Sequence, residues 1–311
     1  MRALRALPVR RATAAVTATV VLSALPTLAA ADAPARPVTP ASHQAGPGAV
    51  RHIALQGAVN VRDLGGHRTE NGRQIRYGQV FRGEALGGLT DADLAVLSAL
   101  DLRTVLDFRT PEEVAQDGAD RLPGELAPTA RPVADLGLYA TTKAVIGSKD
   151  PVRQHEALGN GRAEQLMRDI YRTFVTDAGS RRQFATTIRD IAHHKGAPLL
   201  FHCTSGKDRT GWMSYLLLRA VGVPSSAAER DYLLSNYFRG EADRKVREGL
   251  KQAGYMENPE LLVPLQEVRA DYLGAALDQI RKDYGSFHSY LGEGLGLDAR
   301  TLAKLRARLV R

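Results

Sequence analysis

Residues 201–211 read FHCTSGKDRTG and contain the single cysteine of the 311-residue chain, Cys203. An apolar run at 198–201 predicts a short strand before this segment, and residues 210–221 predict an apolar helix after it. The cysteine is therefore expected in a tight loop between a strand and the N-terminus of a helix. Backbone N–H groups and the helix dipole at such a position stabilise a thiolate and bind phosphate oxygens.

The residue types in this loop fit the hydrolysis of a phosphate monoester through a covalent intermediate. A thiolate at Cys203 supplies the nucleophile. Gly206 lets the loop curl into a ring, and Arg209 offers a planar, two-pronged donor to two phosphate oxygens. The leaving oxygen needs a proton, for which an aspartic acid is the natural donor. The alternative, a structural cysteine buried at a strand end, does not require the surrounding histidine, glycine and arginine.

Strand-like and helix-like segments alternate along the chain, which predicts an α/β sheet flanked by helices with a helical C-terminal region. Helices dominate after residue 209. Residues 117–165 lack a steady period and predict an irregular excursion. The expected strands lie at 79–82, 103–108 and 198–201. The expected helices follow Thr90 and Thr110, which read as N-caps, and occupy 166–176, 181–194, 210–221 and 226–238, with a four-residue repeat from Val268 to Tyr284.

The chain resembles a known family at several points. The HCTSGKDRT segment carries the Cys-x5-Arg signature of the protein tyrosine phosphatase superfamily, and its GKDRTG form together with NVRDLGG at 60–66 resembles a bacterial family of secreted tyrosine phosphatases. Further matches are VFRG at 80–83, VLDFR at 105–109, Glu112, DYLLSN at 231–236 and YGS at 284–286. The resemblance runs from Asn60 to Leu309 and implies a tyrosine phosphatase-like sheet.

The resemblance implies a role for each residue of the loop. Cys203 is the nucleophile, Arg209 the phosphate clamp and Asp208 the general acid, placed inside the loop itself. Asp107 is the competing acid, unless it only pairs with Arg62 or Arg109 and holds the loops. The substrate-binding set is completed by Thr204, Ser205, Gly206, Lys207 and Thr210, with Thr210 expected to hydrogen-bond the thiolate or the leaving group. Secondary candidates are Asp63 and Arg62 in the NVRDLGG segment and His202, which is expected to orient the loop.

Lys207 bears on the choice of substrate. The Cys-x-x-Gly-Lys-x-Arg pattern resembles that of phosphoinositide phosphatases, in which an extra ammonium group could bind a second phosphate. The alternative is a solvated lysine that only raises the local potential. Residues 240–265 resemble a helical lid over the active site, and an ordinary core segment is the alternative.

Charge and composition indicate export. The 42 basic and 34 acidic residues give a net charge of +8, but residues 1–31 hold four basic residues and no acidic one, so the remainder carries +4. Residues 1–31 run from basic through apolar to small and predict a secretory signal cleaved near Ala31; an uncleaved anchor is the alternative, and Sec and twin-arginine export both stay open. Residues 32–50 read as a flexible linker and 51–311 as the catalytic domain.

A single cysteine excludes an internal disulfide and a zinc site of paired cysteines. We expect no cofactor and no metal, since Arg209 and the loop N–H groups meet the phosphate charge. The expected partners are phosphorylated protein, lipid or small-molecule substrates, with no nucleic acid and no stable membrane anchor. Alternatives are a phosphatase of nucleotides or other small phosphorylated metabolites, an inactive phosphate-binding protein, and a sulfurtransferase.

Overall fold

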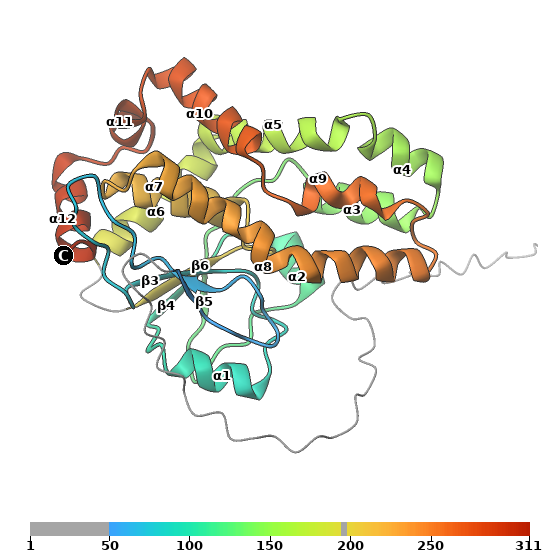
Figure 1. The fold of residues 1–311 in the computed structure, drawn as a ribbon, viewed down its shortest axis with the longest axis horizontal. Helices are drawn as coiled ribbons and strands as arrows, with labels where there is room; N and C mark the ends of the chain where they lie inside the picture. Colours follow the sequence, from blue (N-terminus) through green and yellow to red (C-terminus); the bar gives the residue numbers. More distant parts are fainter. Residues whose placement is uncertain (1–49, 194–197) are drawn as a thin grey trace, which may run out of the picture.

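A computed structural model describes residues 50–193 and 198–311 (Figure 1). The predicted signal peptide and nearly all of the predicted linker lie outside the described residues. The first strand begins at Arg51, where the catalytic domain was expected to begin.

Six strands form one mixed sheet in the order β1-β2-β3-β6-β4-β5. The central strand, β6, pairs in parallel with β3 on one side and β4 on the other, and β5 extends the parallel part. The short strands β1 and β2 are antiparallel. The strand bounds are β1 Arg51–His52, β2 Arg62–Asp63, β3 Val80–Gly83, β4 Thr104–Asp107, β5 Pro128–Ala130 and β6 Leu199–His202.

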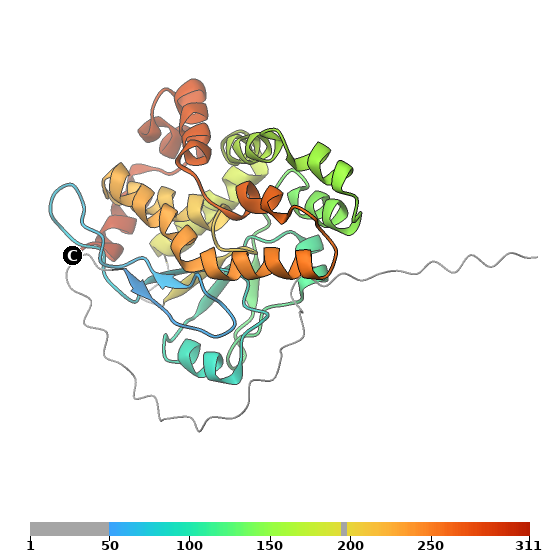
Figure 2. The ribbon, with the colours of Figure 1, turned by 45° about the vertical axis from the view of Figure 1, so that its right-hand side comes forward.

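Successive side chains of β6 point to opposite faces of the sheet. Leu199 and Phe201 belong to the large core beneath the helices, whereas Leu200 belongs to a smaller core that also contains Leu97 of α1 (Asp91–Ser98). Figures 1 and 2 accordingly show α1 on one face of the sheet and the main helical layer on the other. Burial on both faces fixes β6, and with it the start of the loop that follows its carboxyl end.

The main helical layer contains α5 and α6 beside α7 and the long helix α8, and the C-terminal helices complete it (Figure 2). The remaining bounds are α2 Pro111–Asp117, α3 Leu138–Gly147, α4 Pro151–Leu158, α5 Arg162–Thr176, α6 Ala178–His193, α7 Arg209–Ala220, α8 Ser225–Gln252, η1 Pro259–Leu262, α9 Val263–Gln266, α10 Ala270–Tyr284, α11 Phe287–Ser289, η2 Tyr290–Gly294 and α12 Ala299–Leu309.

The two predicted N-caps are confirmed. Thr90 and Thr110 each form a capping box, in which the threonine side chain accepts from the backbone N–H three residues on and the acid there accepts from the cap N–H. These acids are Asp93 and Glu113. The three predicted strands and the α/β class are also confirmed, with each strand boundary shifted by one residue.

Two predictions are wrong. Residues 117–165 are not irregular, because they form β5, α3, α4 and the first turn of α5. These helices are short and separated by glycines, so the sequence shows no sustained hydrophobic period of a helix. The helix expected at 226–238 continues to Gln252, because ion pairs one turn apart, such as Arg239 with Asp243 and Arg244 with Glu248, support its polar second half. None of the helices in the described ranges is long and apolar enough to cross a bilayer.

Candidate active site

The loop that follows β6 curls tightly beneath the N-terminus of α7. Gly206 has a φ of +65°, and a Cβ there would lie 2.4 Å from the carbonyl oxygen of Gly83 in β3. Both the backbone conformation and the close approach therefore require glycine at this position. Cys203 is the first residue of the loop and is only 2% exposed.

Two carbonyl groups of the loop accept hydrogen bonds from side chains outside the loop. The side-chain amide of Asn60 donates to the carbonyls of Ser205 and Gly206 at 3.2 and 3.1 Å, and Arg82 donates to Gly206 at 2.8 Å. No hydrogen bond joins the N–H groups of residues 204–208 to an acceptor in the described part of the chain. The loop thus offers a set of free N–H donors beside the thiol, which is the arrangement that binds a phosphate group.

Arg209 is held by Glu113 of α2. Its NH1 donates to Glu113 Oε2 at 2.7 Å and to the Phe108 carbonyl at 3.2 Å, while its NH2 donates to Glu113 Oε1. Burial would raise the pKa of Glu113, but the hydrogen bond and charge of Arg209, with help from Thr204 and the Thr110 N–H, lower it to about 2. Glu113 therefore fixes the Arg209 guanidinium beside the loop, where Arg209 is expected to bind the phosphate oxygens.

Asp208 receives two hydrogen bonds. Tyr171 donates to its Oδ1 at 3.0 Å and Lys207 donates to its Oδ2 at 2.6 Å. Tyr232 donates in turn to Tyr171 at 2.8 Å, so a buried chain of hydroxyls ends on this carboxylate. The interpretation of Lys207 as a solvated side chain is wrong, because Lys207 is only 3% exposed and its ammonium group is paired with Asp208.

Asp107 lies at the end of β4 and pairs with Arg109. Arg109 Nε lies 3.1 and 3.0 Å from the two carboxylate oxygens, and its NH2 also lies 3.0 Å from Asp120. Asp120 approaches His202 Nε2 at 3.0 Å, so His202 is fixed just before Cys203. The predicted pairing with Arg109 is thus confirmed, while the alternative partner, Arg62, lies elsewhere.

Asp107, Asp120 and His202 bring three potential metal-ligand atoms within 4.8 Å of one another. Their donor set does not fit a divalent cation in this arrangement, because the Arg109 guanidinium contacts both carboxylates. The cluster reads instead as an ion-pair network that supports the strand end preceding the loop.

The NVRDLGG segment supports the loop from behind. Arg62 donates through Nε to Asp231 of α8 at 3.1 Å and through NH1 to Asn60, which holds the loop carbonyls. Arg62 and Asp231 are both buried. Asp63 accepts from the N–H groups of Gly65 and Gly78 and therefore shapes its own turn rather than contacting the loop.

The remaining predicted loop residues are placed around Cys203. The Thr204 hydroxyl donates to Glu113, and the backbone of Ser205 is held by Asn60. Thr210 is buried in the first turn of α7, and its hydroxyl has no hydrogen-bond partner among the described residues.

Comparison with known proteins identifies the family to which this arrangement belongs. The sequence model of the "Tyrosine phosphatase family" matches residues 53–311, which is most of the chain. The chain belongs to the tyrosine phosphatase family. It is an enzyme of the tyrosine-protein phosphatase class, and the family expected from the motifs is confirmed.

Relatives cover most of this tyrosine phosphatase. It is 31% identical over 277 residues to the "Triple specificity protein phosphatase PtpB" of Mycobacterium tuberculosis, covering 82% of this chain and 98% of that protein. It is 31% identical over 229 residues to a "Tyrosine-protein phosphatase" of Nostoc commune, covering 72% and 71%. A crystal structure of Pseudomonas aeruginosa TpbA with phosphotyrosine matches at 18% identity and a TM-score of 0.22 over 67% of this chain and 89% of that one, too low to carry an argument.

Residues of α8 and of the stretch after α9 form contacts close to the phosphatase loop. Arg239 of α8 is paired with Glu84, next to β3, and with Asp243 on its own helix. Lys207 also donates to the carbonyl of Glu267, just after α9, at 3.4 Å. The 240–265 segment contributes Leu262 and Leu265 to the main core, so part of it is core.

Several functional neighbours escaped the sequence analysis. The motif match was placed on Glu112, but its exposed side chain is not the one that binds Arg209; that partner is Glu113. The capping box at Thr110 was a signal for Glu113, since it marks the acid at the third helical position as fixed. Tyr171 and Arg82 carried no local signal, because their contacts with the loop exist only after distant segments pack together.

Proposed function

We propose that this tyrosine phosphatase hydrolyses phosphomonoesters through a cysteinyl-phosphate intermediate at Cys203. The observation that carries the proposal is the hydrogen bonding of the loop. Asn60 and Arg82 bind its carbonyl groups, whereas the N–H groups of residues 204–208 have no acceptor among the described residues. Arg209, fixed by Glu113, adds a bidentate donor for the phosphate oxygens.

Two displacements complete the proposed cycle. In the first, the Cys203 sulfur attacks phosphorus, the ester P–O bond breaks, and the leaving oxygen takes a proton from Asp208. In the second, water attacks phosphorus, the S–P bond breaks, and Asp208 takes the proton from that water. The loop N–H groups and Arg209 stabilise the charge on the phosphoryl oxygens in both steps.

We assign the acid to Asp208 rather than Asp107, because Asp208 belongs to the loop that carries Cys203 and Arg209, whereas Asp107 ends β4 and is held in the ion-pair network of Arg109 and Asp120. A series of leaving groups tests the choice. Loss of a general acid slows a poor leaving group, as in phenyl phosphate, far more than a good one, as in para-nitrophenyl phosphate. Asp208→Asn should show this divergence and Asp107→Asn should not. The reverse pattern would transfer the role to Asp107.

Turnover of para-nitrophenyl phosphate by the full chain tests the activity itself. We expect Cys203→Ser to lose it by at least about a thousandfold, since the serine hydroxyl is not ionised at neutral pH. Equal turnover by wild type and variant would exclude the cysteine mechanism, whereas no turnover by either would favour the inactive phosphate-binding protein.

For substrate, we propose phosphotyrosine and also phosphoinositides. The M. tuberculosis relative is named for triple specificity. Lys207, which pairs with Asp208, brings an ammonium group to the loop that could bind a second phosphate. Lys207→Ala should lower phosphoinositide turnover more than phosphotyrosine turnover. Equal losses on a panel of phosphopeptide, inositide and nucleotide would remove the lysine from substrate choice.

We also propose that the enzyme is secreted after cleavage near Ala31. The basic, apolar and small-residue order of residues 1–31 supports this. Mass spectrometry of the protein recovered from culture medium should give an N-terminus near Asp32. Retention of the full chain in the cell would refute the proposal.

Residues 240–265 are proposed as a partial cover that slows oxidation of Cys203. Three observations support it: Cys203 is 2% exposed, Asp243 within the segment pairs with Arg239, and Lys207 contacts Glu267, two residues beyond its end. Arg239→Gln breaks the pairs of α8 with Glu84 and Asp243 and should speed inactivation by peroxide. Arg244→Gln, on the same helix but in exposed pairs, is the matched control; equal rates in both variants would count against a cover.

A further inference from the structure

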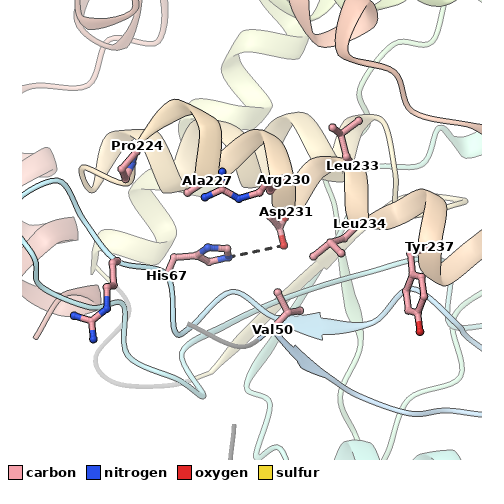
Figure 3. A pocket seen from close by; sticks show the side chains of 10 residues that line it. Val50, His67, Pro224, Ala227, Arg230, Asp231, Leu233, Leu234 and Tyr237 are labelled. Carbon is pink, nitrogen blue, oxygen red and sulfur yellow. Dashed lines mark ion pairs between the residues drawn. The ribbon is translucent and has the colours of Figure 1, made fainter. Parts of the chain in front are cut away.

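A cavity of about 630 Å³ lies between α8 and the loop that follows β2 (Figure 3). This volume is within the range of small-molecule sites. It is lined by His67 and Arg68 from the loop and by Arg230, Asp231, Leu234 and Tyr237 from α8, with other apolar side chains. Neither Cys203 nor any residue of the catalytic loop lines it, so it is distinct from the active site.

The cavity combines an apolar wall with an excess of positive charge. Ala227 and Leu234 give α8 an apolar face toward it, and Tyr237, 80% exposed, stands at one end. Arg230 supplies a guanidinium group, while Arg68, which also lines the cavity, donates from its own guanidinium to the carbonyl of Gly72 at 3.3 Å. Asp231 is the one carboxylate among the residues that line the cavity, and two other arginines already neutralise it.

Those two arginines are Arg62 and Arg82, whose side chains are fully buried. Arg62 Nε lies 3.1 Å from Asp231 Oδ1, and Arg82 NH1 lies 2.6 Å from Asp231 Oδ2. With Arg230, three guanidinium groups therefore surround or line this region, against the one carboxylate among the lining residues. The surplus charge favours an anion in the cavity.

The state of His67 agrees with this charge balance. Its ring points at Asp231 in Figure 3, with Nε2 3.9 Å from Oδ1. Burial lowers the pKa of His67, and although Asp231 opposes this, Arg62, Arg230 and Arg82 lower it further. These effects favour the neutral imidazole, which can donate one N–H to a ligand without adding to the charge.

Asp231 also connects this cavity to the catalytic loop. Its partner Arg82 donates through NH2 to the carbonyl of Gly206 at 2.8 Å. The chain of contacts from the cavity wall to the loop is thus Asp231, Arg82, Gly206. A ligand that draws charge or hydrogen bonds toward the cavity would act on the same carboxylate that fixes Arg82.

We propose that this cavity binds a small amphiphilic anion, with its carboxylate or phosphate head at Arg230 and His67 and its apolar body along Ala227 and Leu234, and that the Asp231–Arg82 contact transmits its occupancy to the catalytic loop. The binding part is independent of the function proposed above, whereas the transmission part rests on it.

Octanoate is the probe, compared with octanol, which lacks the charge, and acetate, which lacks the apolar body. Chemical-shift titration of the full chain gives each affinity and reports on the His67 ring. Octanoate should bind at least about tenfold more tightly than either fragment. Arg230→Gln should weaken it by about tenfold, the order expected for one charge-assisted hydrogen bond. Arg244→Gln removes the same charge from an exposed position on the same helix and should leave the affinity unchanged.

Turnover of para-nitrophenyl phosphate then tests the transmission. Octanoate should change kcat in wild type and in Arg244→Gln, at concentrations that fill the cavity, and should not do so in Arg230→Gln. If octanoate binds Arg230→Gln as tightly as wild type, or if octanol binds wild type as tightly as octanoate, the proposed site is wrong.

If octanoate binds and kcat is unchanged, the proposed transmission is wrong. Competitive inhibition that persists in Arg230→Gln would place the anion at the catalytic loop instead. A protein without any phosphatase activity would refute the proposed function, and the octanoate titration would still test the binding site.

Discussion

Replacement of Glu113 by glutamine tests how the phosphate-binding arginine is held. Glu113 is 1% exposed and bonds Arg209 through both carboxylate oxygens. Although burial favours the protonated form, these contacts lower its pKa from 4.5 to about 2. By linkage, this depression corresponds to about 3 kcal/mol of folding free energy at neutral pH. Glu113→Gln should lose an amount of this order, because a buried guanidinium is left without its counter-charge.

The pH dependence follows from the sign of the shift. Because the folded-state pKa is depressed, the stabilisation is complete above about pH 4.5 and is lost as the pH falls toward 2. Urea unfolding at a series of pH values should therefore show a gap between wild type and Glu113→Gln that is widest at neutral pH. At pH 3 less than half of the gap should remain.

Activity gives a second readout of the same contact. A guanidinium displaced by a fraction of an ångström orients phosphate poorly, so kcat/KM should fall by about 10- to 100-fold. Glu112→Gln is the matched control, since it removes the adjacent, exposed carboxylate. If Glu113→Gln unfolds within about 0.5 kcal/mol of wild type and retains its kcat/KM, the argument that this pair positions Arg209 is wrong.

Three further substitutions probe the support around the loop. Gly206→Ala should lower kcat/KM by about 100-fold, because a Cβ there meets a carbonyl at 2.4 Å; Gly240→Ala, in open space on α8, should be neutral in the same assay. Asp231→Asn should destabilise the fold by about 3–5 kcal/mol in urea unfolding, since it leaves two buried arginines unpaired; a loss below about 1 kcal/mol would contradict this. Tyr171→Phe removes a hydrogen bond to Asp208, so it should cost about 1 kcal/mol in urea unfolding and slow phenyl phosphate more than para-nitrophenyl phosphate. Tyr272→Phe, which loses only a bond to a backbone carbonyl, should leave the ratio of the two rates unchanged.

The sequence was most informative where structure is local. The strand before Cys203, the loop and the helix after it follow from a short apolar run, a glycine and a second apolar run. The capping boxes at Thr90 and Thr110 follow from side chains three residues apart. Such features depend on neighbours in the chain, so they can be read without knowledge of the tertiary fold.

Contacts between residues far apart in the sequence could not be predicted. The partner of Arg62 proved to be Asp231, 169 residues away, and not Asp107. The burial of Lys207 depends on Asp208 and on the chain after α9, which no local pattern reveals. The short helices of 117–165 are stabilised by packing more than by an amphipathic period, so their polar and glycine-rich sequence read as irregular.

The central claim is that phosphate passes through Cys203. Rapid quenching of the enzyme with ³²P-labelled phosphotyrosine peptide, followed by peptide mapping, tests it most directly. We predict acid-stable label on the peptide that contains Cys203 in wild type, and no label in Cys203→Ser. Turnover without a labelled protein, or label on another residue, would contradict the account.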